Sequence, residues 1–395
     1  MIPFVRSDTA GGAHHTVQAP APMAESLRVS VVIPSGRRPD LLCRCLAAVF
    51  AQEIGACAFE VIVVDDHDGE DMQAVVEAFR HRPGAPAVRL VQPRQGHGPA
   101  VARNAGWRAA FGRIVAFTTP DAVPSPDWLS RGERALRPEW VAVSGRIVST
   151  LAPRPPGTRL DPARSARHDG AAQGGHAWHR QGPPPRDPAS GGLADSRRDP
   201  GLRRDPTSGT SPVLSVGGFA TANAFVRRSA LLALGGFDER FRTTGNADSD
   251  LLARLLRDAG PVGRSDDAVV LKRTRPPRWR GSLRQQQDGF FDALLHKKHP
   301  HLSRQLAGSS PPWGHYAIVA LTLAAALLWL ADVHGSALVS LALAGAGMLR
   351  LALRRLRHRA TRGRPLEALL TSVVIPYLSV YWRLRGAIHF RVLFL

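Results

Sequence analysis

Short apolar runs alternate with amphipathic segments through the N-terminal part of the chain. The run RVSVVIP ends at Pro34, and the apolar residues that follow, from Leu41 to Val49, recur at helical spacing. FEVIVVDD, AVRLVQP and RIVAFTTPD are later runs of the same kind, and the segments EDMQAVVEAF and GPAVARNAGWRAAFG between them have the pattern of helices. Strands that alternate with helices in this way predict an α/β fold with a mostly parallel sheet.

Two segments have a different composition. Residues 152–212 are rich in Pro, Gly, Arg and Asp, contain few large aliphatic side chains and show no periodicity. Such a segment buries too little apolar surface to offset the entropy lost on ordering, so we predict a disordered insertion there. Residues 1–26 are Ala/Pro/Gly-rich and predict a disordered N-terminus. After the insertion, the helix ADSDLLARLLRDAG is predicted to end at Gly260 and Pro261.

The chain becomes strongly apolar beyond Pro312. Residues 316–333 have the length needed to cross ~30 Å of hydrocarbon. Residues 336–349 are shorter and contain small residues that suit close helix packing, and residues 366–382 are interrupted by a proline. We therefore predict a C-terminal membrane region over residues 313–395 with two to three hydrophobic helices, the third of them spanning, re-entrant or interfacial.

The distribution of arginine predicts the orientation of this region. The Arg-rich segment 350–364 lies between the second and third apolar segments and favours a cytoplasmic loop by the positive-inside rule. Two crossings separate that loop from the N-terminal domain, and the N-terminus lacks the pattern of a signal peptide, so the domain is also expected in the cytoplasm. A third crossing would leave the arginines at 383, 385 and 391 outside, which fits the rule poorly.

Composition adds a charge and a redox argument. The formal net charge is +20, and it comes almost wholly from Arg. A basic chain can bind nucleic acid, anionic lipid or a phosphate-bearing substrate. Since the chain has no basic helix with interleaved aromatic residues, nucleic acid is the least favoured of these partners. Cys43, Cys45 and Cys57 lack metal-ligand spacing and fit a reducing compartment.

Charged side chains occur where the predicted sheet would present them together. Asp65 and Asp66 follow the second strand, Asp121 follows the fourth, and Arg103 lies on the helix between. At the carboxyl ends of parallel strands, acids can accept hydrogen bonds from a base and a ribose, and a metal can bridge an acid to a diphosphate. Each acid alone can equally be a turn residue that binds local N–H groups. Their joint placement with Asp248 favours a nucleotide site.

These segments together resemble a known family. VSVVIPSGRRPDLLCRCLAAVFAQ, VIVVDD, ARNAGWRAAFGRIVAF and PDAVPSPDWL are similar to the nucleotide-sugar half of the inverting glycosyltransferases of family 2, which have the Rossmann-like GT-A fold. TANAFVRRSALLALGGFDERF and DSDLLARLL are similar to the acceptor half. RPPRWRGSLRQQQDGFFDALLHKKHP and the apolar tail resemble the membrane-attached bacterial members. The resemblance covers residues 28–150 and 213–300 and implies a GT-A domain over residues 27–300.

The resemblance also implies an activity and a location. A member of this family transfers a sugar from a nucleotide-diphosphate sugar to a glycan or lipid-linked acceptor, usually with Mg²⁺ or Mn²⁺. The bacterial type implies a multi-pass protein of the inner membrane with its catalytic domain in the cytoplasm. Asp248 would be the general base that deprotonates the acceptor hydroxyl. The other implied roles are donor binding by Pro34, Asp65, Asp66, Arg103 and Asp121, metal binding by Asp121, and acceptor-side contacts by Asn223 and Asp250.

Three positions depart from the family pattern. Thr119 stands where the family has the first Asp of its D-x-D motif, Ala247 replaces the Glu of a Glu-Asp pair, and Lys272 stands where a His commonly follows the last strand. Metal binding through Asp121 alone stays open, because the diphosphate and water supply most Mg²⁺ ligands. Lys272 can itself neutralise diphosphate charge. The departures also leave a second hypothesis open, a catalytically silent GT-A-like membrane scaffold or partner protein.

Overall fold

The computed structural model describes most of the chain. The described residues are 27–36, 38–66, 70–93, 95–151, 210–211, 218–274, 279–302, 312–357 and 365–393. The predicted disordered N-terminus, residues 1–26, lies outside them. So does the predicted insertion, residues 152–212, apart from Thr210 and Ser211, which form a short strand.

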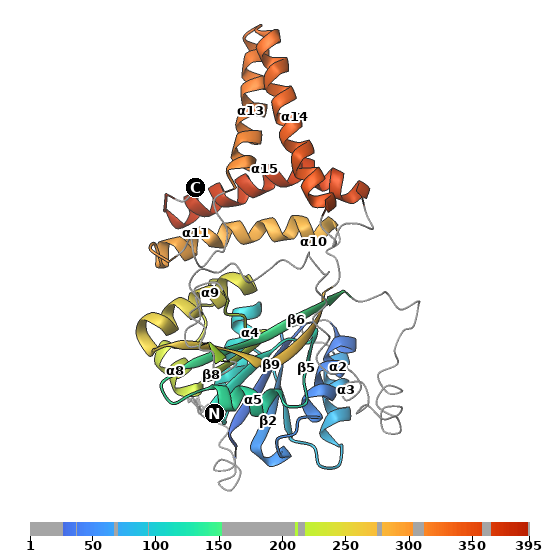
Figure 1. The fold of residues 1–395 in the computed structure, drawn as a ribbon, viewed down its shortest axis with the longest axis vertical. Helices are drawn as coiled ribbons and strands as arrows, with labels where there is room; N and C mark the ends of the chain where they lie inside the picture. Colours follow the sequence, from blue (N-terminus) through green and yellow to red (C-terminus); the bar gives the residue numbers. More distant parts are fainter. Residues whose placement is uncertain are drawn as a thin grey trace, which may run out of the picture.

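The described strands form one mixed sheet. They follow the order β3-β2-β1-β4-β8-β6-β9-β5, with β7 beside β9 (Figure 1). β1 is parallel to β2 and β4, and β2 is parallel to β3, which confirms the four strands predicted from the apolar runs. The strands are β1 (Val29–Ser35), β2 (Phe59–Asp65), β3 (Ala87–Val91), β4 (Ile114–Thr118), β5 (Ala122–Pro124), β6 (Ala142–Leu151), β7 (Thr210–Ser211), β8 (Asn223–Arg227) and β9 (Val262–Thr274).

The second half of the sheet is mixed in direction. β8 is antiparallel to β4 and β6, whereas β6 and β9 are parallel to each other. β5 ends the sheet and is antiparallel to β9. The sequence pattern does not predict β5, because this strand is 3 residues long and ends in Pro124. Proline has no N–H for a strand ladder and is tolerated at such an edge.

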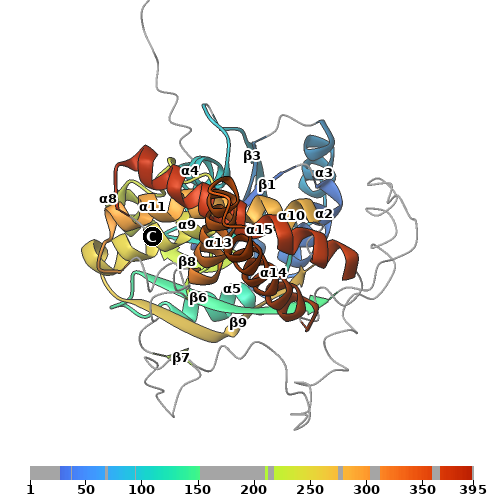
Figure 2. The same ribbon diagram turned by 90° about the horizontal axis from the view of Figure 1, so that it is seen from above.

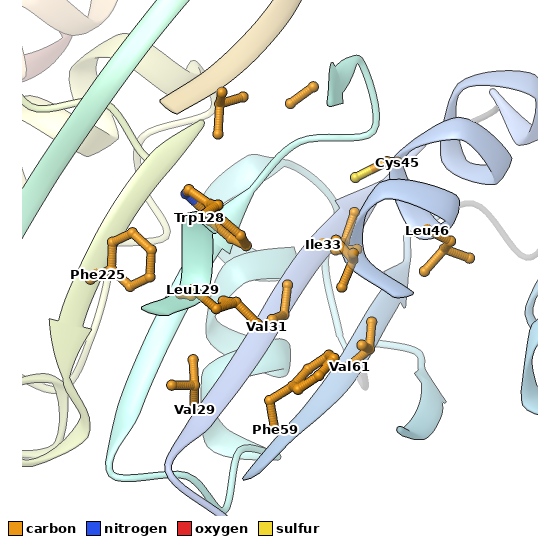
Figure 3. Packing of buried hydrophobic residues seen from close by; sticks show 14 of the residues in the cluster. Val29, Val31, Ile33, Cys45, Leu46, Phe59, Val61, Trp128, Leu129 and Phe225 are labelled. Atoms are coloured by element: carbon orange, nitrogen blue, oxygen red, sulfur yellow. The ribbon is translucent and has the colours of Figure 1, made fainter. Parts of the chain in front are cut away.

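Helices cover both faces of the sheet because apolar side chains of β1 alternate between them. Val31 and Ile33 pack on one face with Leu46 and Trp128 (Figure 3). Val32 packs on the other face. Figure 2 shows the helices on the two sides of the strands. The first face carries α2 (Pro39–Phe50), η1 (Ala56–Ala58), α3 (Glu70–Arg80) and α5 (Trp128–Ala135), and the second carries α4 (Pro99–Arg108), α8 (Arg228–Leu234), α9 (Thr244–Arg254) and η2 (Leu255–Ala259).

The C-terminal helices form two groups (Figure 1). Two of them pair as a hairpin that projects away from the sheet. The others lie across the base of this hairpin, between it and the sheet. The hairpin is α13 (Trp313–Leu330) and α14 (His334–Arg357), and the base contains α10 (Trp279–Arg284), η3 (Gln285–Gln287), α11 (Asp288–Lys298) and α15 (Pro365–Phe390).

Among the described helices, α13 and α14 are long and apolar enough to cross a membrane, judged by length and composition. They correspond to the first two predicted segments. α14 continues to Arg357, so the segment 350–364, predicted as a loop, begins as helix, and its residues from 358 to 364 lie outside the described part. The third predicted segment is part of α15, which continues through Pro376 and packs along α11. It is not a third candidate span.

Candidate active site

The acids predicted to bind a donor emerge at one edge of the sheet. β1 lies between β2 and β4, and its register places Pro34 and Ser35 beside the end of β2. Asp65 is the last residue of β2 and is buried, whereas Asp66 follows it and is partly exposed. The turn after β4, which contains Asp121, leaves the same edge on the other side of β1. The fold therefore gathers these predicted donor residues, and their individual roles stay predictions.

Asp248 is a buried carboxylate on α9 with a fixed orientation. The backbone N–H of Thr221 donates to its Oδ2 at 3.0 Å, and the Thr221 hydroxyl donates to its Oδ1 at 2.8 Å. Burial raises the pKa of Asp248, and the Arg103 guanidinium and the Thr221 bonds oppose that shift only in part. A carboxylate with a raised pKa is a stronger base than an ordinary one, so this group is suited to accept a proton.

Arg103 brings a buried positive charge from α4 to Asp248. Its Nη1 lies 3.9 Å from Asp248 Oδ1, and its guanidinium carbon lies 5.5 Å from the centre of the Phe237 ring. Burial lowers the pKa of Arg103, and Asp248 opposes that shift. Within the described part of the chain, Nε and Nη1 of Arg103 have no hydrogen-bond partner. Arg103 therefore partly compensates the buried charge of Asp248 and places α4 against α9.

The turn after β4 holds a second cluster, formed by Thr119, Asp121 and Lys272. The Thr119 hydroxyl donates to Asp121 Oδ1 at 2.6 Å, and Lys272 Nζ lies 3.4 Å from Asp121 Oδ2. Lys272 lies within β9, opposite Ala122 of β5, so the prediction that it follows the last strand is wrong. Both carboxylate oxygens of Asp121 have a protein partner in this cluster.

A divalent cation fits this cluster poorly. Mg²⁺ and Mn²⁺ prefer several oxygen ligands, and Asp121 is the one carboxylate of the cluster. In the ranges that the structure describes, no group of three or more His, Cys, Asp or Glu side chains is placed to hold a metal. A metal at Asp121 would have to displace the Lys272 ammonium and would take its other ligands from a substrate and water.

Asn223 lies inside the sheet rather than on its surface. It is fully buried, and its Oδ1 accepts a hydrogen bond from Trp128 Nε1 at 2.8 Å. Its Nδ2 donates to the carbonyl oxygens of Arg146 and Ala268 at 3.0 and 2.9 Å. Asn223 therefore connects β8 to α5, β6 and β9. Direct contact with an acceptor, the role predicted for it, would require these bonds to open.

Asp250 is fully buried and has three basic partners. Arg254 Nε and His299 Nε2 each lie 2.9 Å from its carboxylate, and Lys298 Nζ also binds it. Arg254 belongs to α9 itself, whereas Lys298 and His299 stand at the end of α11. This arrangement favours a structural role, in which Asp250 fixes α9 to α11. The acceptor-side role of Asp250 stays a prediction.

Asn104 joins the predicted donor half of the domain to the predicted acceptor half. Its Nδ2 donates to the carbonyl oxygen of Phe237 at 2.8 Å, and its Oδ1 accepts from the Phe237 N–H at 2.9 Å. Gly236 precedes Phe237 with φ +77°, and a Cβ there would lie 2.5 Å from Asn104 Oδ1. Only glycine allows both this backbone conformation and this close approach. Arg103, the neighbour of Asn104, is thereby held in place.

Two residues of the site, Thr221 and Asp292, are not predicted by the sequence analysis. Thr221 holds Asp248, and the only local signal for it is its place just before the strand that begins at Asn223. Asp292 on α11 accepts hydrogen bonds from Asn246 Nδ2 at 2.9 Å and from Arg383 Nη2 at 3.2 Å. It therefore connects α9 to α15. Partners so far apart in the sequence leave no local pattern.

Comparison with known proteins agrees with the resemblance. The model of the family described as "Glycosyl transferase family 2" matches residues 30–172. The succinoglycan biosynthesis protein ExoO of Rhizobium meliloti is 36% identical over 103 residues, which are 26% of this chain and 28% of that protein. The glycosyltransferase AglE of Haloferax volcanii is 29% identical over 125 residues, 32% of this chain and 40% of that protein.

A solved structure covers more of the chain. The mannosyltransferase PcManGT from Pyrobaculum calidifontis, in complex with GDP-Man and Mn²⁺, is 18% identical and aligns with a TM-score of 0.49 over 89% of this chain and 87% of that chain. The two curated relatives above are matched over less than half of their own length. The residues matched by the family model include the predicted donor residues Pro34, Asp65, Asp66, Arg103 and Asp121. Residues 30–172 of this chain are therefore similar to glycosyltransferase family 2.

Proposed function

We propose that this protein is a membrane-attached glycosyltransferase that transfers a sugar from a nucleoside-diphosphate sugar to a glycan or lipid-linked acceptor, with inversion. The observation that carries the proposal is the Asp248 carboxylate, which is buried, oriented by Thr221 and paired with Arg103. The names of the relatives, a succinoglycan biosynthesis protein and a glycosyltransferase, support sugar transfer in the assembly of a glycan.

In the proposed reaction, Asp248 acts on the acceptor. Its carboxylate takes the proton of an acceptor hydroxyl while the hydroxyl oxygen forms a bond to the anomeric carbon of the donor. The bond from that carbon to the diphosphate breaks, and its electron pair leaves with the nucleoside diphosphate. Attack opposite the leaving group inverts the anomeric centre. Thr221 keeps the carboxylate in one orientation, which lowers the entropy lost on reaching the reactive geometry.

The donor is proposed to lie across the strand ends. Asp65 and Asp66 are the acids that can accept hydrogen bonds from the base and the ribose, because they emerge where a nucleotide binds in sheets of this type. Pro34 shapes the first-strand turn beside them. The donor diphosphate would then lie towards Asp121, on the other side of β1.

Donor use is the direct test of the proposed function. Purified full-length protein in detergent or nanodiscs, given single nucleoside-diphosphate sugars and a lipid-linked glycan extract, is expected to release nucleoside diphosphate with at least one donor. Release and the appearance of labelled glycan are the two readouts. The silent-scaffold hypothesis, favoured by Thr119 and Ala247, predicts neither with any donor. Boiled protein and extract alone are the controls.

The α13–α14 hairpin supports attachment to a membrane. At a rise of 1.5 Å per residue, the 18 residues of α13 span roughly 27 Å, close to the ~30 Å of a hydrocarbon core. Trp313 stands at the base of the hairpin and Trp329 near its tip, and both are largely exposed. Aromatic residues at the two ends of an apolar span are typical of interfacial anchors. The packing is close, because a Cβ on Gly347 would lie 2.9 Å from Ile318 Cγ1.

α15 fits the membrane interface rather than the hydrocarbon core. Its exposed large apolar side chains recur at helical spacing along one face, and its other side packs on α11. Buried Arg383 and exposed Arg385 lie near the C-terminal end of this helix. The exposed apolar side chains are Leu366, Leu369, Leu370, Val373, Val374, Tyr377, Tyr381, Leu384 and Ile388. With α15 on the domain side, the arginines at its end lie on the same side as the Arg-rich end of α14, in agreement with the positive-inside rule.

Cysteine labelling can test this topology. In Ala331→Cys, the new thiol lies at the exposed turn of the hairpin, and the native exposed Cys57 lies in the catalytic domain. A membrane-impermeant maleimide is expected to label Ala331→Cys in intact bacterial cells in which the parent stays unlabelled, and to label both after permeabilisation. Equal labelling before and after permeabilisation, or recovery of the protein in the soluble fraction, would contradict the proposed insertion of the hairpin.

A further inference from the structure

The Asp121 carboxylate already has partners in the protein for both of its oxygens. Thr119 donates to one carboxylate oxygen at 2.6 Å, and the Lys272 ammonium lies 3.4 Å from the other. One acid and one ammonium sum to no net charge, whereas a protein site for a divalent cation on a diphosphate usually offers one or two free carboxylates. The positive charge that such a cation would bring is already present as a side chain.

We propose that the Lys272 ammonium binds the diphosphate of the donor and that donor binding needs no divalent cation. The inference rests on the proposed function, since it assigns the diphosphate subsite of the same donor. Lys272 belongs to β9 and pairs with Ala122, the residue after Asp121, so the strand ladder fixes it at the sheet edge where the donor acids emerge.

The position of Lys272 suits this role. Its side chain is 30% exposed, and that of Asp121 is 33% exposed, so a ligand can reach both groups. The charge of Lys272 also acts on Asp248, where it lowers the pKa of that carboxyl against the larger effect of burial. Lys272 therefore contacts Asp121, and its charge also reaches Asp248, so a diphosphate leaving during an attack assisted by Asp248 can come within reach of the ammonium.

Thr119 supports the same reading. A carboxylate in its place would add a negative charge next to Asp121, and Lys272 alone could not neutralise both acids and a diphosphate. The Thr119 hydroxyl instead donates a hydrogen bond to Asp121, which holds that side chain while leaving the ammonium free to turn towards a phosphate oxygen. Thr119 and Lys272 thus have complementary effects. Thr119 is neutral and adds no negative charge beside Asp121, and Lys272 provides the positive charge for a diphosphate.

Nucleoside-diphosphate binding tests the inference without any turnover. Full-length protein in nanodiscs is titrated with UDP, GDP, ADP, CDP and dTDP by calorimetry, in EDTA and in Mn²⁺. We expect one of them to bind with the same Kd in both conditions. Lys272→Met should weaken that Kd by roughly 10- to 100-fold, as expected for the loss of a hydrogen bond between charged groups. Lys272→Arg should largely retain binding in EDTA, and Lys297→Met, an exposed lysine on α11, is the matched control that should leave Kd unchanged.

A second variant reverses the proposed arrangement. Thr119→Asp combined with Lys272→His should bind the nucleotide weakly in EDTA and regain affinity with Mn²⁺, because it restores two acids and removes the ammonium. Melting temperatures of all variants show whether a loss reflects unfolding. Parent binding that is lost in EDTA and restored by Mn²⁺, or a Kd unaffected by Lys272→Met, would overturn the inference and leave the transferase proposal standing. No binding of any nucleoside diphosphate, with or without Mn²⁺, would overturn both.

Discussion

Asp248→Asn is expected to abolish sugar transfer while nucleoside-diphosphate binding stays intact. Asparagine keeps the size of the side chain and can still accept a hydrogen bond from Thr221, but it cannot take a proton from the acceptor. Loss of a general base typically lowers the rate by about 10²- to 10⁴-fold. The change should fall on kcat, measured as transfer to an acceptor at saturating donor, because the base acts in the transition state rather than in donor binding.

Two further measurements separate this role from a structural one. Asp258→Asn, which alters an exposed carboxylate near the end of the same helical segment, should leave transfer unchanged. In the parent, kcat should fall on the acid side as Asp248 becomes protonated. Since burial raises the pKa of Asp248, this fall should begin at a higher pH than an ordinary aspartate would give. Full activity of Asp248→Asn, or loss of donor affinity in that variant, would remove Asp248 from the role of base.

The parallel part of the fold could be predicted because its signals are local. Val31, Ile33 and Val32 alternate between two cores, and this pattern repeats in the next strands with helices between them. β5 could not be predicted, since a strand of 3 residues ending in proline has no period to detect. The position of α15 was also not predictable, because an apolar segment of its length fits a span as well as an interfacial helix. Only its packing on α11 distinguishes the two.

The site shows the same division between local and distant information. Asp65 ends one strand and Asp121 follows another, both located by the apolar pattern, whereas Asp248 lies within α9 and could be predicted through the family resemblance. Their surroundings could not. Nothing in the sequence near Asp248 indicates that Thr221 binds both of its oxygens. Nor does any local feature show that Lys272 reaches Asp121, because β5 and β9 meet only through the register of the sheet.

Asp250→Ala is expected to cause the largest loss of stability among the site variants. The change removes a buried acid and leaves Arg254, Lys298 and His299 without their shared partner, so buried positive charge loses its compensation. Removing one partner of a buried ion pair typically costs about 3–5 kcal/mol of the free energy of unfolding, because an uncompensated charge stays behind. Denaturant unfolding of the parent and the variant measures this difference. Asp258→Ala, at an exposed acid paired with Arg257, is the control and should change stability little.

The same network predicts how stability depends on pH. Burial alone would raise the pKa of Asp250, but its three basic partners outweigh burial and hold that pKa below its usual range. The carboxylate therefore stabilises the fold above the pKa that it has in the unfolded chain, and this contribution is lost as the pH falls towards the folded-state pKa. Asp250→Asn, which cannot titrate, should lose less stability than the parent between neutral and acidic pH. Parallel acid profiles for the parent and Asp250→Asn would show that Asp250 does not fix α9 to α11 through its charge.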